Sequence, residues 1–184
     1  HASAERELLD FEVEVNALGG ASTIVVFDME RSGCGLAWDY TFPNEPRPRL
    51  ISYTEDRDLW RFDLPHSKAI HAYCASYEPT VEMRDTFYAA LEIDEGFRAC
   101  RREGEAILRY HDQLVEQAAK EPKEVVINGH KILTVECPLI SLVSDLGHKL
   151  AEGRPFAMVT LSKSDGSVYH SLRSREDGLD VSVI

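Results

Sequence analysis

The chain has 184 residues, of which 43% are hydrophobic and 28% are charged, and its 20 basic and 32 acidic residues give a net charge of −12 at pH 7. This composition is typical of a globular chain that forms one large domain or two small ones. No apolar run approaches the roughly 18 residues that span a bilayer, so we expect no membrane partner. The negative charge repels phosphate backbones, which argues against binding of long DNA or RNA.

The four cysteines, Cys34, Cys74, Cys100 and Cys137, are far apart in the sequence. Their spacing matches neither a Cys-x-x-Cys metal site nor a dense disulfide framework. We therefore expect reduced thiols and a location in the cytoplasm or another reducing compartment.

The first half of the chain is predicted to consist of helices and one strand. Ser3 can cap a short helix that carries Leu8, Leu9 and Phe11. The run Thr23–Phe27 is continuously β-favouring, which suits a strand buried on both faces in the centre of a parallel sheet. Capping residues and prolines predict four further helices: 33–40, 48 to 58 or 60, 67–76 and 80–91.

A long helix is predicted to open the second half, because apolar or small residues recur at steps of three and four between Asp94 and Lys120. The pattern then changes to strands, with an Asn128-Gly129 hairpin turn. The expected elements are strands at 124–127, 130–136, 156–162 and 167–173, and a short helix at 141–150. We place a domain boundary within the long helix or at Pro122.

The densest acidic cluster is Glu55-Asp56-Arg57-Asp58. Hard divalent cations require such oxygen ligands. A solvated helix end with an internal ion pair explains the same pattern. The seven histidines show no helical zinc-pair spacing, and we interpret the internal ones as structural.

The last predicted strand has two chemically distinct faces. Alternation places Val168, His170 and Leu172 on one face, and Tyr169, Ser171, Arg173 and Arg175 on the other. Two guanidinium groups and two hydroxyls form a donor set for phosphate or carboxylate. A merely solvated sheet face fits the pattern equally well.

Several stretches, taken in order, resemble the DHH phosphoesterase superfamily, and more narrowly its predicted hydrolases with a C-terminal DHH-associated domain. Relatives include RecJ-type exonucleases, nanoRNases, cyclic dinucleotide phosphodiesterases and family II inorganic pyrophosphatases. The resemblance covers essentially the whole chain. The matching stretches are His1-Ala2-Ser3-Ala4, Phe27-Asp28-Met29-Glu30-Arg31-Ser32-Gly33, Leu36-Ala37-Trp38, Glu55-Asp56-Arg57-Asp58-Leu59-Trp60, Leu150-Ala151-Glu152-Gly153-Arg154-Pro155-Phe156 and Ser171-Leu172-Arg173-Ser174.

The resemblance implies a site with two Mn²⁺ ions, Mg²⁺ being the alternative metal. His1 resembles the final histidine of the Asp-His-His motif, Asp56 the last metal-ligating aspartate, and Asp58 the alternative to Asp56. His1 and Asp56 are therefore the implied catalytic residues. The other metal motifs would lie before residue 1, and the glycine-rich segment that ends in histidine would follow Ile184.

The second domain of the family binds substrate phosphate. Arg173 matches the arginine that serves this purpose in relatives, and Ser171 and Ser174 are lesser partners. One departure is that Glu136-Cys137-Pro138 stands where many relatives carry an asparagine.

The fold implied is α/β, in three parts. Residues 1–93 would be the helix-rich C-terminal part of a parallel-sheet DHH catalytic domain, 94–122 a long connecting helix, and 123–184 a smaller, partial α+β DHH-associated substrate-binding domain. The complete protein would hydrolyse phosphodiester or phosphoanhydride bonds of small nucleotides or short oligonucleotides. The alternative is a non-catalytic structural or interaction component with the same fold. The sequence leaves open a homodimer or a larger assembly.

Overall fold

The computed structural model describes residues 2–19, 22–175 and 177–184. This described part contains seven α-helices and one four-stranded mixed sheet, which confirms the mixed α/β class. The chain divides into two compact units, residues 1–108 (unit 1) and residues 109–184 (unit 2). The division falls inside the long helix α6 (Asp94–Ala118), so one helix contributes to both units.

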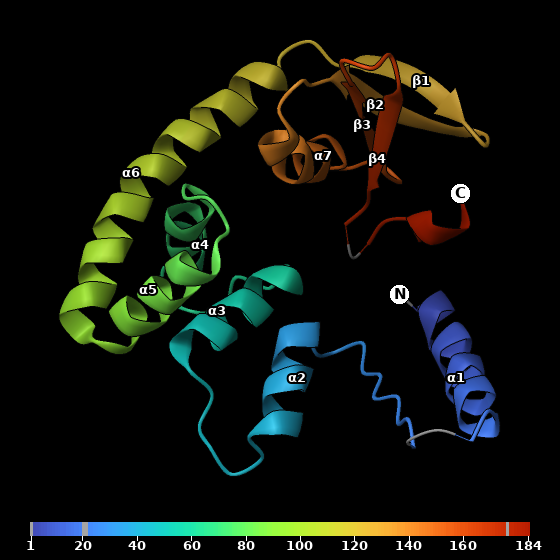
Figure 1. The fold of residues 1–184 in the computed structure, drawn as a ribbon. Coiled ribbons are helices and arrows are strands. Elements are labelled where there is room, and N and C mark those ends of the chain that lie inside the picture. Colours follow the sequence, from blue (N-terminus) through green and yellow to red (C-terminus); the bar gives the residue numbers. More distant parts are fainter. Residues whose placement is uncertain (1, 20–21, 176) are drawn as a thin grey trace. The chain divides into compact units, whose positions relative to one another are not determined.

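Unit 1 is helical throughout its regular part (Figure 1). Its helices are α1 (Ala2–Ala17), α2 (Gly33–Thr41), α3 (Arg49–Asp58), α4 (Ser67–Ala75), α5 (Val81–Glu92) and the first part of α6. Two expected caps are present. The Ser32 hydroxyl accepts a hydrogen bond from the Gly35 amide, and the Thr80 hydroxyl accepts one from the Met83 amide. The predicted helices are therefore confirmed.

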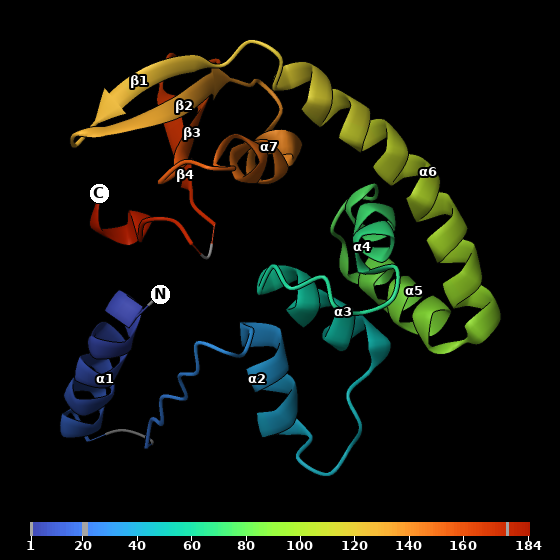
Figure 2. The same cartoon turned by 180° about the vertical axis from the view of Figure 1, so that it is seen from behind.

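The core of unit 1 forms where α3, α4, α5 and α6 meet. Ile70, Leu91 and Cys100 are buried, and Leu50 and Phe97 are among the side chains that pack around them. A β-carbon on Gly104 of α6 would overlap the carbonyl group of Ala69 of α4. The two helices therefore approach one another more closely than any larger residue permits. Figures 1 and 2 both show α4 and α5 beside the first part of α6.

The prediction of a central strand at Thr23–Phe27 is wrong. The described residues of this segment form no strand, and the side chains of Ile24 and Val26 are 67% and 55% exposed. Side chains of α1 provide hydrogen bonds that a neighbouring strand would otherwise provide. Asn16 donates to the Thr23 carbonyl and accepts from the Thr23 amide, and Glu12 accepts from the Val25 amide. The reason is topological, because a strand needs a neighbouring strand and the described part of unit 1 offers none.

Unit 2 is a sheet with a helix on one face (Figures 1 and 2). Its elements after α6 are β1 (Lys123–Ile127), β2 (His130–Glu136), the 3₁₀ turn η1 (Ile140–Leu142), α7 (Val143–Leu150), β3 (Ala157–Ser162), β4 (Val168–Arg173) and η2 (Val181–Val183). The sheet order is β1-β2-β3-β4. The outer pairs are antiparallel, and β2 and β3 are parallel, joined by a crossover that contains α7. The predicted strands and hairpin turn are confirmed.

Unit 2 has the larger core. Its buried residues lie on α6, η1, α7 and β3 and directly after β2 and α7: Val115, Cys137, Leu142, Val143, Leu146, Leu150, Ala151, Ala157, Val159 and Leu161. The cysteines at 34, 74, 100 and 137 are free thiols. Among the described residues, no helix combines the length and apolarity needed to cross a membrane.

Candidate functional site

The acidic cluster lies at the C-terminal end of α3, and its three carboxylates have different surroundings. Glu55 and Asp56 are buried, with only 8% and 6% of each residue exposed, whereas the Asp58 side chain is 47% exposed. Burial of a carboxylate requires hydrogen bonds or counter-charges in compensation. The interpretation as a solvated helix end therefore applies to Asp58 but not to the other two.

Asp56 organises the loop that follows α3. Its carboxylate accepts hydrogen bonds from the amides of Asp63 (2.9 Å) and Leu64 (3.3 Å). Its backbone carbonyl accepts from the amides of Arg61 (2.9 Å) and Phe62 (3.4 Å). One residue thus provides acceptors for four consecutive amides of an irregular segment, 59–66.

Segment 59–66, called the aromatic loop below, has a strained backbone. Trp60, Phe62 and His66 adopt φ values of 58°, 55° and 64°, in the left-handed region that favours glycine. Non-glycine residues held there cost of order 1–3 kcal/mol each and persist only where the surroundings fix them. The four hydrogen bonds from the amides of residues 61–64 to Asp56 supply that constraint around Trp60 and Phe62.

Glu55 belongs to a separate charged network that joins α3 to α2. Its carboxylate accepts from the Ser32 amide (3.0 Å) and from Arg47 (2.6 Å). Burial opposes ionisation of Glu55, but these bonds outweigh it and hold its pKa below the usual value. Arg47 also donates twice to Asp39, and this contact, with help from Arg31, lowers the pKa of Asp39 to about 2.

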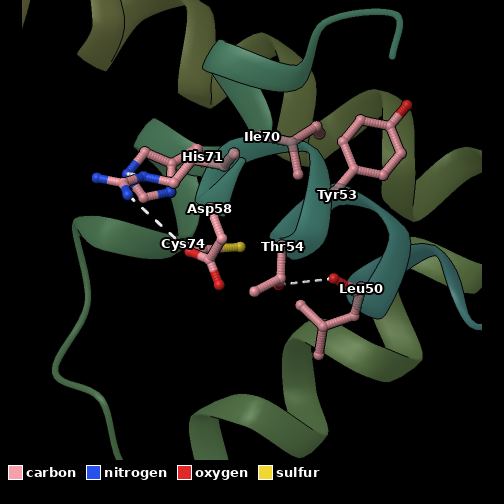
Figure 3. Close-up of a pocket in the computed structure, with 8 residues that line it drawn as sticks. Leu50, Tyr53, Thr54, Asp58, Ile70, His71 and Cys74 are labelled. Carbon is pink, nitrogen blue, oxygen red and sulfur yellow. Dashed lines mark hydrogen bonds and ion pairs between the residues drawn. The ribbon is translucent and has the colours of Figure 1, made fainter. Parts of the chain in front are cut away.

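Asp58 lies at the edge of a small pocket between α3 and α4 (Figure 3). Leu50, Tyr53, Ile70 and Cys74 give the pocket a largely apolar wall. Its volume of about 150 Å³ is below the roughly 300 Å³ at which small-molecule pockets begin. The remaining lining residues are Thr54, Arg57 and His71.

The thiol in this pocket is not an activated nucleophile. Burial raises the pKa of Cys74 to about 12, so the thiol stays protonated at neutral pH. The Arg57 guanidinium donates to His71 Nε2 over 3.3 Å. His71 thus acts as an acceptor at this nitrogen.

Metal binding requires several donors at one point. Asp56 and Asp58 offer the oxygen chemistry that Mn²⁺ or Mg²⁺ prefers. Within the described residues, however, no three His, Cys, Asp or Glu side chains are grouped to hold an ion. His1 lies outside the described residues. The donors described here therefore do not by themselves form the implied two-metal site.

Arg173, the predicted phosphate-binding residue, lies at the end of β4 on the face covered by α7. A β-carbon on Gly147 of α7 would come within 2.7 Å of Arg173 Cγ, so the arginine stem rests on the bare glycine backbone. The guanidinium donates to the Leu172 carbonyl (2.9 Å) and the Ser144 hydroxyl (3.3 Å). We call Arg173, Ser144 and Gly147 the Arg173 site.

The two serines expected beside Arg173 have different positions. Ser171 is 2% exposed beneath α7, and its hydroxyl has no hydrogen-bond partner in the described part of the chain. Ser174 is half-buried, beyond the end of β4. Ser171 and Arg173 thus share one face, as alternation predicts, but only Arg173 extends to the edge of the helix.

Sequence reasoning missed Ser144 and Gly147, the α7 part of the Arg173 site. A glycine inside a predicted helix is a usable signal, since it often marks a close approach. It also missed the roles of Arg47 and Asp39, because nothing in the local sequence links them to Glu55.

Comparisons with known proteins found a similarity to a viral protein. No family model matches the chain, and no solved structure matches it. The chain is 28% identical over 165 residues to "Uncharacterized protein R106" of Acanthamoeba polyphaga mimivirus. The match covers 86% of this chain but 38% of the viral protein, so the chain spans less than half the length of that relative.

Proposed function

We propose that the chain is part of a metal-dependent phosphoesterase of the DHH superfamily, which hydrolyses phosphodiester or phosphoanhydride bonds of small nucleotides or short oligonucleotides. The proposal rests on the ordered motifs in the sequence and on one structural observation, the Arg173 site. The metal dependence is implied by the resemblance alone. We assign no catalytic step to a metal, because the described donors do not assemble a site for one.

The Arg173 site suits an anion with several oxygens. A guanidinium carries five N–H donors in a planar fork, and the contacts to Leu172 and Ser144 occupy only part of them. Packing on Gly147 fixes the stem of the side chain, so little conformational entropy remains to be lost on binding. Ser144 adds a hydroxyl beside the guanidinium.

The proposed phosphate contact can be tested by titrating the protein with a 5′-phosphorylated diadenylate in a calorimeter. Loss of a charge-assisted, bidentate contact costs about 1.5–3 kcal/mol, so Arg173→Ala should weaken binding roughly 10- to 150-fold. Arg173→Lys should recover only part of the affinity, because an ammonium group cannot reproduce the fork. Gly147→Ala keeps the charge but displaces the side chain, and it should also weaken binding.

Lys163→Ala is the matched control, since Lys163 is an exposed cation of the same unit in the β3–β4 turn. It should leave the affinity unchanged. If the diadenylate binds equally well to wild type and Arg173→Ala, or does not bind at all, the phosphate site is overturned. The competing non-catalytic role would then be the better account of the chain.

A further inference from the structure

The aromatic loop carries a cluster of rings and cations that the proposed hydrolytic function does not use. The Trp60 and Phe62 rings meet edge to face, with centroids 5.1 Å apart, and both residues are half-buried. Arg57 lies over the Trp60 ring at 5.3 Å, and Lys68 lies over the Phe62 ring at 5.0 Å. Such geometry is that of cation–π contacts.

The backbone shows that the two rings are placed at a cost. Trp60 and Phe62 both occupy the left-handed region, where glycine would be accommodated without strain. The hydrogen bonds to Asp56 hold the loop in this shape, although Trp and Phe are poorly suited to it. The loop therefore presents these particular side chains against the preference of its own backbone.

One cation beside the rings, Lys68, can meet the anionic group of an aromatic ligand. The cations of this region are Arg57, Arg61 and Lys68, and the carboxylates near them are Asp56, Asp58, Asp63 and Glu30, so the region as a whole has no excess of positive charge. Arg57 lies near Asp58, and Arg61 donates to Glu30. Lys68 is exposed and forms no ion pair with any carboxylate of the described residues, so its charge is available to a phosphate.

We infer that the aromatic loop is a nucleotide-binding subsite, in which Trp60 and Phe62 contact the base and Lys68 contacts its phosphate. Stacking on aromatic side chains accepts any base, since every base has a π-face. The inference rests on the proposed function for its ligand class. It adds a base-contacting element carried by unit 1, whereas Arg173 belongs to unit 2.

The test compares two ligands that share a phosphate and differ in the base, 5′-AMP and ribose 5-phosphate, in calorimetric titrations of the full chain. Trp60→Gly and Phe62→Gly remove one ring each and also relieve the left-handed backbone. Each should weaken AMP binding roughly 5- to 150-fold, the range measured for loss of one stacked base, and leave ribose 5-phosphate unaffected. Lys68→Gln should weaken both ligands.

Two further variants keep the test decisive. Phe62→Tyr retains a ring and should bind AMP as wild type does, which separates loss of stacking from loss of folding. Tyr88→Ala removes an exposed aromatic side chain on α5 and should change nothing. The subsite is overturned if AMP binds equally to wild type and both glycine variants, or if AMP and ribose 5-phosphate bind equally to wild type. Failure of the proposed function is distinct, because the 5′-phosphorylated diadenylate would then bind equally to wild type and Arg173→Ala, whatever the result for AMP at the aromatic loop.

Discussion

At the scale of single residues, Asp56 has two proposed roles, one as a metal ligand and one in holding the aromatic loop. The resemblance assigns it to a metal, and the structure places it at the centre of the aromatic loop. The two roles are compatible, since each carboxylate oxygen has two lone pairs and accepts only one amide here. Loss of Asp56 would therefore affect folding as well as any chemistry.

Asp56→Ala should lower the free energy of unfolding by about 1–3 kcal/mol, because the Asp63 and Leu64 amides would lose their acceptor in a partly buried loop. Asp58→Ala is the matched control, and as a half-exposed acid it should change the value by no more than about 0.5 kcal/mol. Urea denaturation at pH 7 measures both. Equal stability of the two variants would show that Asp56 does not hold the loop.

At the scale of elements, local sequence signals predicted a helix or strand correctly where the contacts that stabilise it lie close by in the sequence. Ser32 caps α2 and Thr80 caps α5, and Asn128-Gly129 turns the hairpin, because each signal acts over a few residues. The run Thr23–Phe27 failed, since β propensity predicts a strand only where a partner strand exists.

For a similar reason, the sequence predicted only part of the candidate site. Alternation along β4 correctly places Ser171 and Arg173 on one face. It cannot reveal that α7 covers this face and that Gly147 lies under the arginine, because that contact joins positions 26 residues apart. Likewise, the aromatic loop is strained because Trp60 and Phe62 have positive φ angles. The residue types Trp and Phe do not predict such angles.

The network between α2 and α3 should make stability sensitive to acid. Asp39 and Glu55 have folded-state pKa values below their ordinary values of 3.8 and 4.5. The stability that they contribute is therefore present above pH 4.5 and is lost as the pH falls towards about 2, the folded-state pKa of Asp39. Arg47→Met removes a partner of both carboxylates, so the stability of this variant should fall less steeply as the pH is lowered.

The measurement is the urea midpoint at a series of pH values from neutral to acid. Arg61→Met, which removes an exposed ion pair with Glu30, should keep the wild-type slope. An Arg47→Met variant with the same acid slope as wild type would show that this network is not the source of the pH dependence.

At the scale of the whole molecule, the net charge bears on the length of nucleic acid that we expect to bind. A chain with a charge of −12 repels each phosphate that lies beyond a local cationic group. At the proposed sites, the few phosphates of a short nucleotide would lie beside Arg173 or Lys68, whereas most phosphates of a long strand would not. We therefore expect affinity to stop rising with length after a few nucleotides.

Fluorescence anisotropy with a labelled 5′-phosphorylated trinucleotide and a labelled duplex of about 40 base pairs tests this expectation. The trinucleotide should bind and the duplex should not, across salt concentrations of about 50 to 200 mM. A duplex that binds more tightly, with a steep loss of affinity as salt rises, would reveal a phosphate-tracking surface that the charge balance argues against.

The order of strands in unit 2 has a consequence for how this part of the chain folds. Each strand pairs with the strand next to it in the sequence, so β1-β2-β3-β4 is both the chain order and the sheet order. The two antiparallel pairs close over short turns, whereas the parallel pair β2–β3 closes over the crossover that contains α7 and has the largest entropy of loop closure. Unit 2 should therefore complete its sheet by successive addition of neighbours, starting from the tight turn at Asn128-Gly129.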